Sequence, residues 1–169
     1  MYRAIVLTVS DRSFRGERPD EGGPLVAQML RDAGYDVVLS AIVPDEQPEI
    51  EAFLKECPET KLLFDVGHLA VAGGDVEYVA ATYYDRIVAY HLKGWQTSDT
   101  PDAEEWWRRG FFCGLAQGDT PINNEFVYKN AVKKGFDGWV FIEQDTHLRD
   151  PYLDLEESYA LLRKWRKEV

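Results

Sequence analysis

Cysteine is scarce in this sequence, which contains only two among its 169 residues. Cys57 and Cys113 are far apart and form no CxxC pair, so there is neither a disulfide framework nor a cysteine-rich zinc motif. No apolar run approaches the length of a membrane-spanning helix, and residues 4–9 are too few for the core of a signal peptide. These absences predict a protein of the reducing cytoplasm without a membrane partner.

Positive charge is also in short supply. The chain has 19 basic and 30 acidic residues, a formal net charge of −11, and no stripe rich in Lys and Arg. This balance excludes nucleic acid and anionic membrane surfaces as expected partners. With 45% apolar and 29% charged residues, the composition is that of an ordinary globular protein, and the length is typical of one domain. We therefore expect residues 1–169 to form a single α/β domain.

Short apolar runs alternate with amphipathic stretches along the whole chain. The runs predict strands at residues 4–9, 36–43, 62–66, 87–92 and 139–143, and the stretches predict helices at residues 25–33, 50–57, 76–83, 122–134 and 153–167. Such alternation favours parallel strands joined by right-handed crossovers. A closed eight-stranded barrel typically needs about 250 residues, more than this chain has. We therefore expect one five-stranded, parallel, doubly wound sheet in the flavodoxin-like order 2-1-3-4-5, with helices on both faces.

Residues 94–120 interrupt this alternation with a long connection that includes a short predicted helix near residues 104–112. Connections of this length are usually functional loops or lids. Within the connection, large aromatic side chains gather at Trp106, Trp107, Phe111 and Phe112. These rings either pack on the chain's own helices or form an exposed patch through which the chain dimerises. A monomer and a homodimer through this segment both remain open.

Asp65, His91 and Glu143 lie at the ends of the third, fourth and fifth predicted strands. In open α/β sheets, ligands bind at the carboxyl edge, where these three side chains meet. Two carboxylates and one imidazole suit Mn²⁺, Fe²⁺, Co²⁺ or Mg²⁺, and zinc accepts the same ligands. Taken singly, each residue is more often a helix cap, a loop anchor or a core histidine. Nothing in the sequence requires a cofactor, but the set of three is a candidate divalent-metal site.

Three N-terminal segments match one family in the right order: Val9-Ser-Asp-Arg-Ser13, Asp20-Glu-Gly-Gly-Pro24 and Val43-Pro-Asp-Glu-Gln47. Over about residues 3–56 the chain resembles the molybdopterin adenylyltransferases of molybdenum cofactor biosynthesis. The resemblance places Asp45 at the pterin pocket. The family's Thr-Gly-Gly-Thr-Gly loop, whose backbone N–H groups would hold phosphate, is absent. Cap and strand-end roles therefore describe these segments better than pterin chemistry does.

The rest of the chain carries a second set of motifs, which includes Leu63-Phe-Asp-Val-Gly-His-Leu69, His91-Leu-Lys93 and Gly138-Trp-Val-Phe-Ile-Glu-Gln-Asp145. Over about residues 60–167 it resembles the last three βα units of xylose-isomerase-like sugar isomerase barrels, in the inosose dehydratase branch. In that family Glu, Asp, His and Glu hold a divalent metal, and the resemblance maps the last three onto Asp65, His91 and Glu143. It also implies substrate contacts at His68 and Lys93. The first Glu ligand has no counterpart in this sequence.

The two resemblances meet near residues 57–61. We interpret the chain as a chimera, engineered or recombined in the laboratory, with a natural fusion as the alternative. On this interpretation no native catalytic site is intact, and at most residual binding of a metal or small ligand survives at the strand ends. One alternative function is a metal-dependent sugar isomerase or inosose dehydratase-like lyase. A further alternative is a phosphate or pterin binder at residues 10–16, although that loop has no P-loop spacing.

Overall fold

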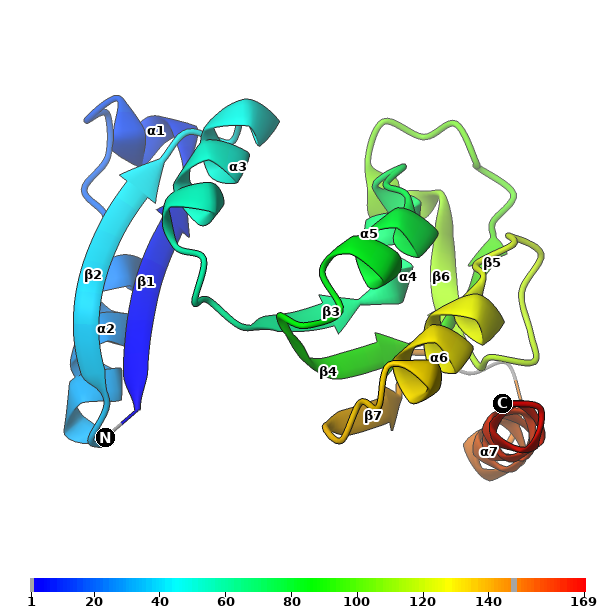
Figure 1. Cartoon of the computed structure of the whole chain (residues 1–169). Helices are drawn as coiled ribbons and strands as arrows, with labels where there is room; N and C mark the ends of the chain where they lie inside the picture. The colour runs from blue at the N-terminus through cyan, green and yellow to red at the C-terminus, as the bar shows by residue number, and fades with distance from the viewer. Residues whose placement is uncertain (1, 147–148) are drawn as a thin grey trace. The chain divides into compact units, whose positions relative to one another are not determined.

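The computed structural model of the chain describes residues 2–146 and 149–169 (Figure 1). The chain divides into two compact units, Met1–Thr60 and Lys61–Val169. The division falls within residues 57–61, where the two sequence resemblances meet.

The first unit is a two-stranded parallel sheet with three helices. Its elements are β1 (Arg3–Val9), α1 (Asp11–Phe14), α2 (Gly22–Asp32), β2 (Asp36–Val43) and α3 (Gln47–Glu56). Asp20 fixes the start of α2, because its carboxylate accepts hydrogen bonds from Gly23 N at 3.0 Å and from Thr8 Oγ1 at 2.8 Å. Both bonds lower the pKa of Asp20, and the bond from Gly23 has the larger effect. The Asp-Glu-Gly-Gly-Pro segment therefore ties the start of α2 to β1.

The second unit contains a three-stranded parallel sheet in the order β3-β4-β7 and a separate antiparallel pair, β5-β6. Its elements are β3 (Leu62–Asp65), α4 (Val66–Val71), α5 (Val76–Thr82), β4 (Ile87–Leu92), β5 (Gly94–Thr97), the 3-10 helix η1 (Trp106–Arg108), β6 (Gly110–Cys113), α6 (Asn124–Lys133), β7 (Trp139–Ile142) and α7 (Pro151–Lys167). Strand β5 follows β4 directly, and α6 leads the chain back to β7 at the edge of the three-stranded sheet (Figure 1).

The core of this unit lies on one face of the three-stranded sheet. Phe64, Tyr90 and Leu92 are buried there against helix residues that include Val127 and Trp165. Because side chains alternate along a strand, the residues next to these, Asp65 and His91, lie on the opposite face. The packing of the core therefore sets the register that places Asp65 beside His91.

The prediction of a single five-stranded doubly wound sheet is wrong, because the strands form separate sheets of two, three and two strands. All five predicted strands are present, and the last three pair in parallel in the predicted order. Alternating strands and helices specify βα units, but both open sheets and barrels are built from these units. The pattern therefore does not determine which strand edges pair. The helices α1 and α4 and the pair β5-β6 were not predicted.

We expect Leu92→Ala to lower the free energy of unfolding by about 3 kcal/mol, because it leaves a cavity in the core. Leu92 is fully buried, whereas Leu63, on the neighbouring strand, is 56% exposed. Leu63→Ala removes the same atoms and should cost less than about 1 kcal/mol. Urea denaturation followed by circular dichroism measures both variants. Equal losses would contradict the assignment of the two sheet faces.

Candidate metal centre

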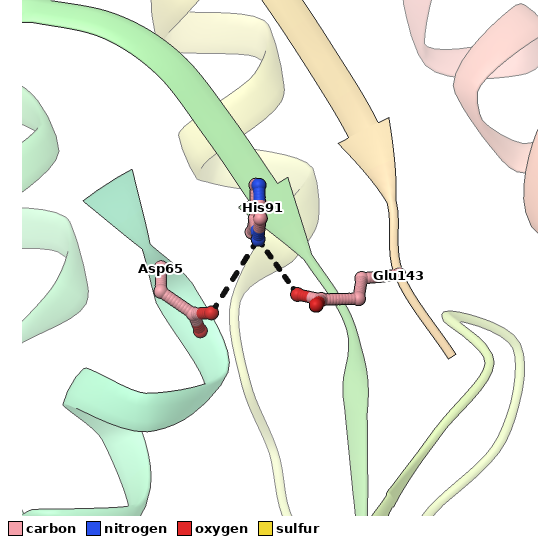
Figure 2. A group of neighbouring side chains, drawn as sticks. All are labelled: Asp65, His91 and Glu143. Atoms are coloured by element: carbon pink, nitrogen blue, oxygen red, sulfur yellow. Dashed lines mark hydrogen bonds and ion pairs between the residues drawn. The ribbon is translucent and has the colours of Figure 1, made fainter. Parts of the chain in front are cut away.

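The three predicted strand-end residues meet in the structure (Figure 2). Asp65 ends β3, His91 lies in β4 and Glu143 follows β7 directly. His91 Nδ1 lies 2.7 Å from Glu143 Oε2 and 3.7 Å from Asp65 Oδ2. One ligand atom from each residue lies within 4.8 Å of the others. The parallel register produces this grouping, because it brings the carboxyl ends of three adjacent strands to one edge.

Lys93 supplies a positive charge to the same cluster. Its side chain is only 1% exposed, and its Nζ lies 2.6 Å from Glu143 Oε2, 3.1 Å from Asp65 Oδ2 and 3.2 Å from Asp145 Oδ2. One ammonium thus contacts three carboxylates. Asp145 was not predicted as a member of the site, although it stands two residues after Glu143 in the Glu-Gln-Asp motif. The only sequence feature that pointed to Asp145 was its position two residues after Glu143, in the segment that follows β7.

The contacts within the cluster shift the pKa of two of its members. Burial by itself would raise the pKa of Glu143, but hydrogen bonds from Lys93 and His91 hold it below its usual value. Burial by itself would lower the pKa of Lys93, but hydrogen bonds to Glu143 and Asp65 hold it above its usual value. Both shifts favour the charged forms, the carboxylate of Glu143 and the ammonium of Lys93.

Two local features position Lys93 and Asp65. A Cβ on Gly67 would stand 2.4 Å from Lys93 Cγ, so only glycine leaves room for the lysine to cross the first turn of α4. Asp65 is also the N-cap of α4, where its Oδ1 accepts a hydrogen bond from His68 N at 2.9 Å. The other oxygen, Oδ2, faces Lys93. Asp65 therefore has two roles: one oxygen caps a helix, as expected of a lone aspartate, and the other belongs to the charged cluster.

An aromatic wall stands beside the cluster. The ring of His68 packs edge-on against Phe112 at 4.6 Å and Trp106 at 5.9 Å, and Lys93 Nζ lies 4.4 Å from the centroid of the Phe112 ring. The predicted substrate-contacting residues thus occupy different places, with Lys93 among the carboxylates and His68 at this wall. Trp107 is 63% exposed. Whether these aromatic residues mediate dimerisation stays a prediction.

Asp154, at the start of α7, anchors the segment that carries Glu143 and Asp145. Its buried carboxylate accepts hydrogen bonds from Gln144 Nε2 at 2.6 Å, from Arg149 Nε at 2.5 Å and from Gln117 Nε2. Burial by itself would raise the pKa of Asp154, and these bonds lower it. Gln144 stands between Glu143 and Asp145, so the carboxylate of Asp154 holds in place the segment that follows β7.

Asp45 lies in the first unit, and its backbone N donates a hydrogen bond to Asp11 Oδ1 at 3.0 Å. Within the predicted loop at residues 10–16, Ser10 caps the short helix α1, because its Oγ accepts from Ser13 N at 3.3 Å. These are the cap and turn contacts expected of such residues. A pterin or phosphate site at Asp45 or at residues 10–16 stays a prediction.

Comparison with known proteins bears on the second set of motifs. The family model of the xylose isomerase-like TIM barrel matches residues 25–167. The chain belongs to this family. A solved structure, a xylose isomerase domain protein from Alicyclobacillus acidocaldarius, aligns with 98% of this chain and 64% of its own at a TM-score of 0.52 and 17% identity. The barrel fold of this family thus replaces the predicted flavodoxin-like order.

Curated relatives of the barrel family are named inosose dehydratases. The one from Lacticaseibacillus casei is 30% identical over 112 residues, which is 63% of this chain and 36% of the relative. The one from Salmonella typhimurium is 27% identical over 129 residues, or 72% of this chain and 41% of the relative. The chain thus spans well under half the length of either relative.

The similarity to molybdopterin adenylyltransferase is weaker and partial. The protein of that name from Pyrococcus furiosus is 41% identical over 49 residues, which is 29% of this chain and 28% of the relative. The barrel family model runs through residues 57–61. The comparisons therefore do not show a chimera or an engineered protein. Among the described residues, no helix is both long and apolar enough to cross a membrane.

We expect Lys93→Met to lower the free energy of unfolding by about 3 kcal/mol at pH 7, because three carboxylates lose the ammonium between them. The pKa of Glu143 is lowered in the folded state, so this stabilisation is present above the ordinary carboxyl pKa and is lost as pH falls through the folded-state value. The difference between Lys93→Met and the parent should therefore shrink toward pH 3. Urea denaturation at both pH values measures it.

Lys55→Met is the control, because Lys55 pairs with exposed Glu51 at 3.3 Å. We expect its effect to stay below about 1 kcal/mol at either pH. A loss in Lys93→Met that is equally large at pH 7 and pH 3 would show that packing, and not charge, accounts for it.

Proposed function

We propose that Asp65, His91 and Glu143 bind a divalent cation and that the chain carries the metal-binding strands of a sugar isomerase or inosose dehydratase-like lyase. The observation that carries the proposal is the convergence of an imidazole and two carboxylates from three adjacent strand ends, within 4.8 Å. In barrel enzymes the catalytic residues stand at this end of the strands.

The residues present fit such a cation. One nitrogen and two carboxylates are a donor set for Mn²⁺, Co²⁺, Zn²⁺ or Mg²⁺. These carboxylates already attract one cation, since three carboxylate oxygens lie within 3.2 Å of the charged nitrogen of Lys93, which a bound metal would have to displace. The cluster thus already accommodates one positive charge. Three protein ligands also leave coordination positions open to substrate oxygens.

When bound, the metal supplies a Lewis acid for a substrate carbonyl or hydroxyl oxygen. The chain's own groups supply the remaining chemistry. The Lys93 ammonium donates hydrogen bonds and is placed to hold a substrate oxygen beside the carboxylates. Asp145, which is half-exposed, accepts a proton from a substrate hydroxyl or from a carbon next to a carbonyl. The aromatic wall at Phe112 and Trp106 shields one side of the site from water.

The proposed substrate class follows from the proposed reaction. An isomerase or a dehydratase acts on a carbonyl with neighbouring hydroxyls, as in a keto-sugar or an inosose. The named activity of the curated relatives makes inosose the first compound to test. Because the chain matches only 36% of the Lacticaseibacillus casei relative, the activity of that whole protein is part of this proposal.

Calorimetric titration of metal-free protein with Mn²⁺ tests the binding site. We expect a micromolar dissociation constant in the parent and at least about tenfold weaker binding in Asp65→Asn and Glu143→Gln. Asp75→Asn is the matched control, because Asp75 caps α5 by accepting from Tyr78 N at 2.8 Å, just as Asp65 caps α4. Asparagine also caps helices, so Asp65→Asn and Asp75→Asn should both fold. Equal weakening in Asp75→Asn, or no saturable heat in the parent, would refute the site.

Incubation with an inosose and Mn²⁺, followed by NMR, tests the reaction. We expect loss of water from the inosose in the parent and its loss or strong reduction in Glu143→Gln. Metal binding without turnover would retain the metal site and overturn the dehydratase assignment.

A further inference from the structure

A groove lies on the helix side of the three-stranded sheet, between α6, α7 and β7. Its volume is about 500 Å³. Val140 of β7 forms part of the floor, and its register partner Tyr90 belongs to the core face. Asp65 and His91 stand at strand positions that face the other way. The groove is therefore separate from the candidate metal centre, and its role is independent of the proposed function.

The groove is apolar inside. Ala131 and Val132 of α6, Phe136 and Val140 line it, together with Leu162 of α7. Tyr128 and Tyr159 also border it, one from each helix. Such a surface favours a planar or aliphatic group, because its burial removes apolar area from water.

The rim is cationic. Arg163, Arg166 and Lys167 follow Tyr159 and Leu162 at helical spacing, so one face of α7 supplies both apolar and charged groups. The Arg163 guanidinium lies 5.9 Å from the centroid of the Tyr159 ring. A neighbouring hollow of about 400 Å³ shares Arg163 and Lys167 with the groove. Lys164 also lines this second hollow, and its one acidic residue, Glu168, is paired with Lys129 at 2.6 Å.

Arg163, Arg166 and Lys167 have no carboxylate partner among the residues that the structure describes. Elsewhere in the unit the arrangement differs, since Lys129 contacts both Glu125 and Glu168 at 2.6 Å. Basic residues in the last turn of a helix complement its dipole, which explains the position of Arg166 and Lys167 in α7 but not that of Arg163. The dipole does not explain an apolar groove beneath them. In a chain with a net charge of −11, such a local excess of free positive charge is a specific feature.

We propose that this groove binds an organic anion, with its phosphate or carboxylate at Arg163, Arg166 and Lys167 and its apolar body between α6 and α7. Guanidinium groups pair with phosphate and carboxylate oxygens in bidentate geometry, and the adjacent tyrosines provide ring faces for a planar body. Neither an inorganic anion nor a neutral apolar molecule uses both parts of the groove.

Phenyl phosphate is the probe, and NMR chemical-shift titration of the full chain is the measurement. We expect saturable shifts in α6 and α7, with inorganic phosphate and benzyl alcohol each binding at least about tenfold more weakly. Arg163→Gln/Arg166→Gln should weaken phenyl phosphate binding at least about tenfold. Val132→Phe fills the groove and should weaken phenyl phosphate but not inorganic phosphate.

Lys61→Gln/Lys133→Gln is the matched control, because it removes two positive charges from the same unit at residues that line neither hollow, and it should leave the affinity unchanged. Equal weakening in this control would mean that net charge governs binding and would overturn the proposal. Absence of saturable shifts with phenyl phosphate would overturn it as well. Binding of phosphatidic acid vesicles without binding of phenyl phosphate would reject a free organic anion in favour of a lipid headgroup.

Discussion

The candidate site depends on one buried ammonium. Three carboxylates from β3 and from the segment after β7 would repel one another if Lys93 did not stand between them. Burying such charges is costly, and their attraction offsets that cost only when the geometry is good. The structure meets this requirement through Gly67, which leaves room for the lysine, and through Asp154, which anchors the segment that carries Glu143 and Asp145.

This arrangement also connects the two faces of the sheet. On one face the core residues Tyr90 and Leu92 set the register, and on the other face that register places His91 between two acidic side chains. The site therefore rests on strands that the core holds in place, while the aromatic wall comes from β6 and η1. In barrel enzymes, catalytic residues usually stand at the ends of the strands, and the loops above them vary.

Much of the site could be predicted from the sequence. Asp65, His91 and Glu143 were recognised because each ends an apolar run, and parallel pairing brings such ends together. Asp145 and Asp154 were missed because one lies in a segment beyond the strand and the other on a polar turn of a helix, where carboxylates are usually exposed. Only the fold brings Gln144 and Asp154 into contact.

The fold was harder to predict from the sequence than the site. A βα unit is specified by residues close together in the sequence, whereas the pairing of strands into a sheet depends on residues far apart. The pattern of residues 62–92 defines two strands and the connection between them, but nothing in it says which edge the next strand will occupy. The motifs around Leu63–Leu69 and Gly138–Asp145 indicated the barrel family more reliably than strand counting did, and the family model that spans residues 25–167 agrees with them.

The metal centre is best tested by a crystal structure of the protein soaked in Mn²⁺, with an anomalous difference map. We expect a peak bound by Asp65, His91 and Glu143, with the Lys93 ammonium displaced from between the carboxylates. A map without a peak there, with Lys93 still in contact with Asp65 and Glu143, would contradict the metal centre and leave the cluster as an ion-pair network that stabilises the fold.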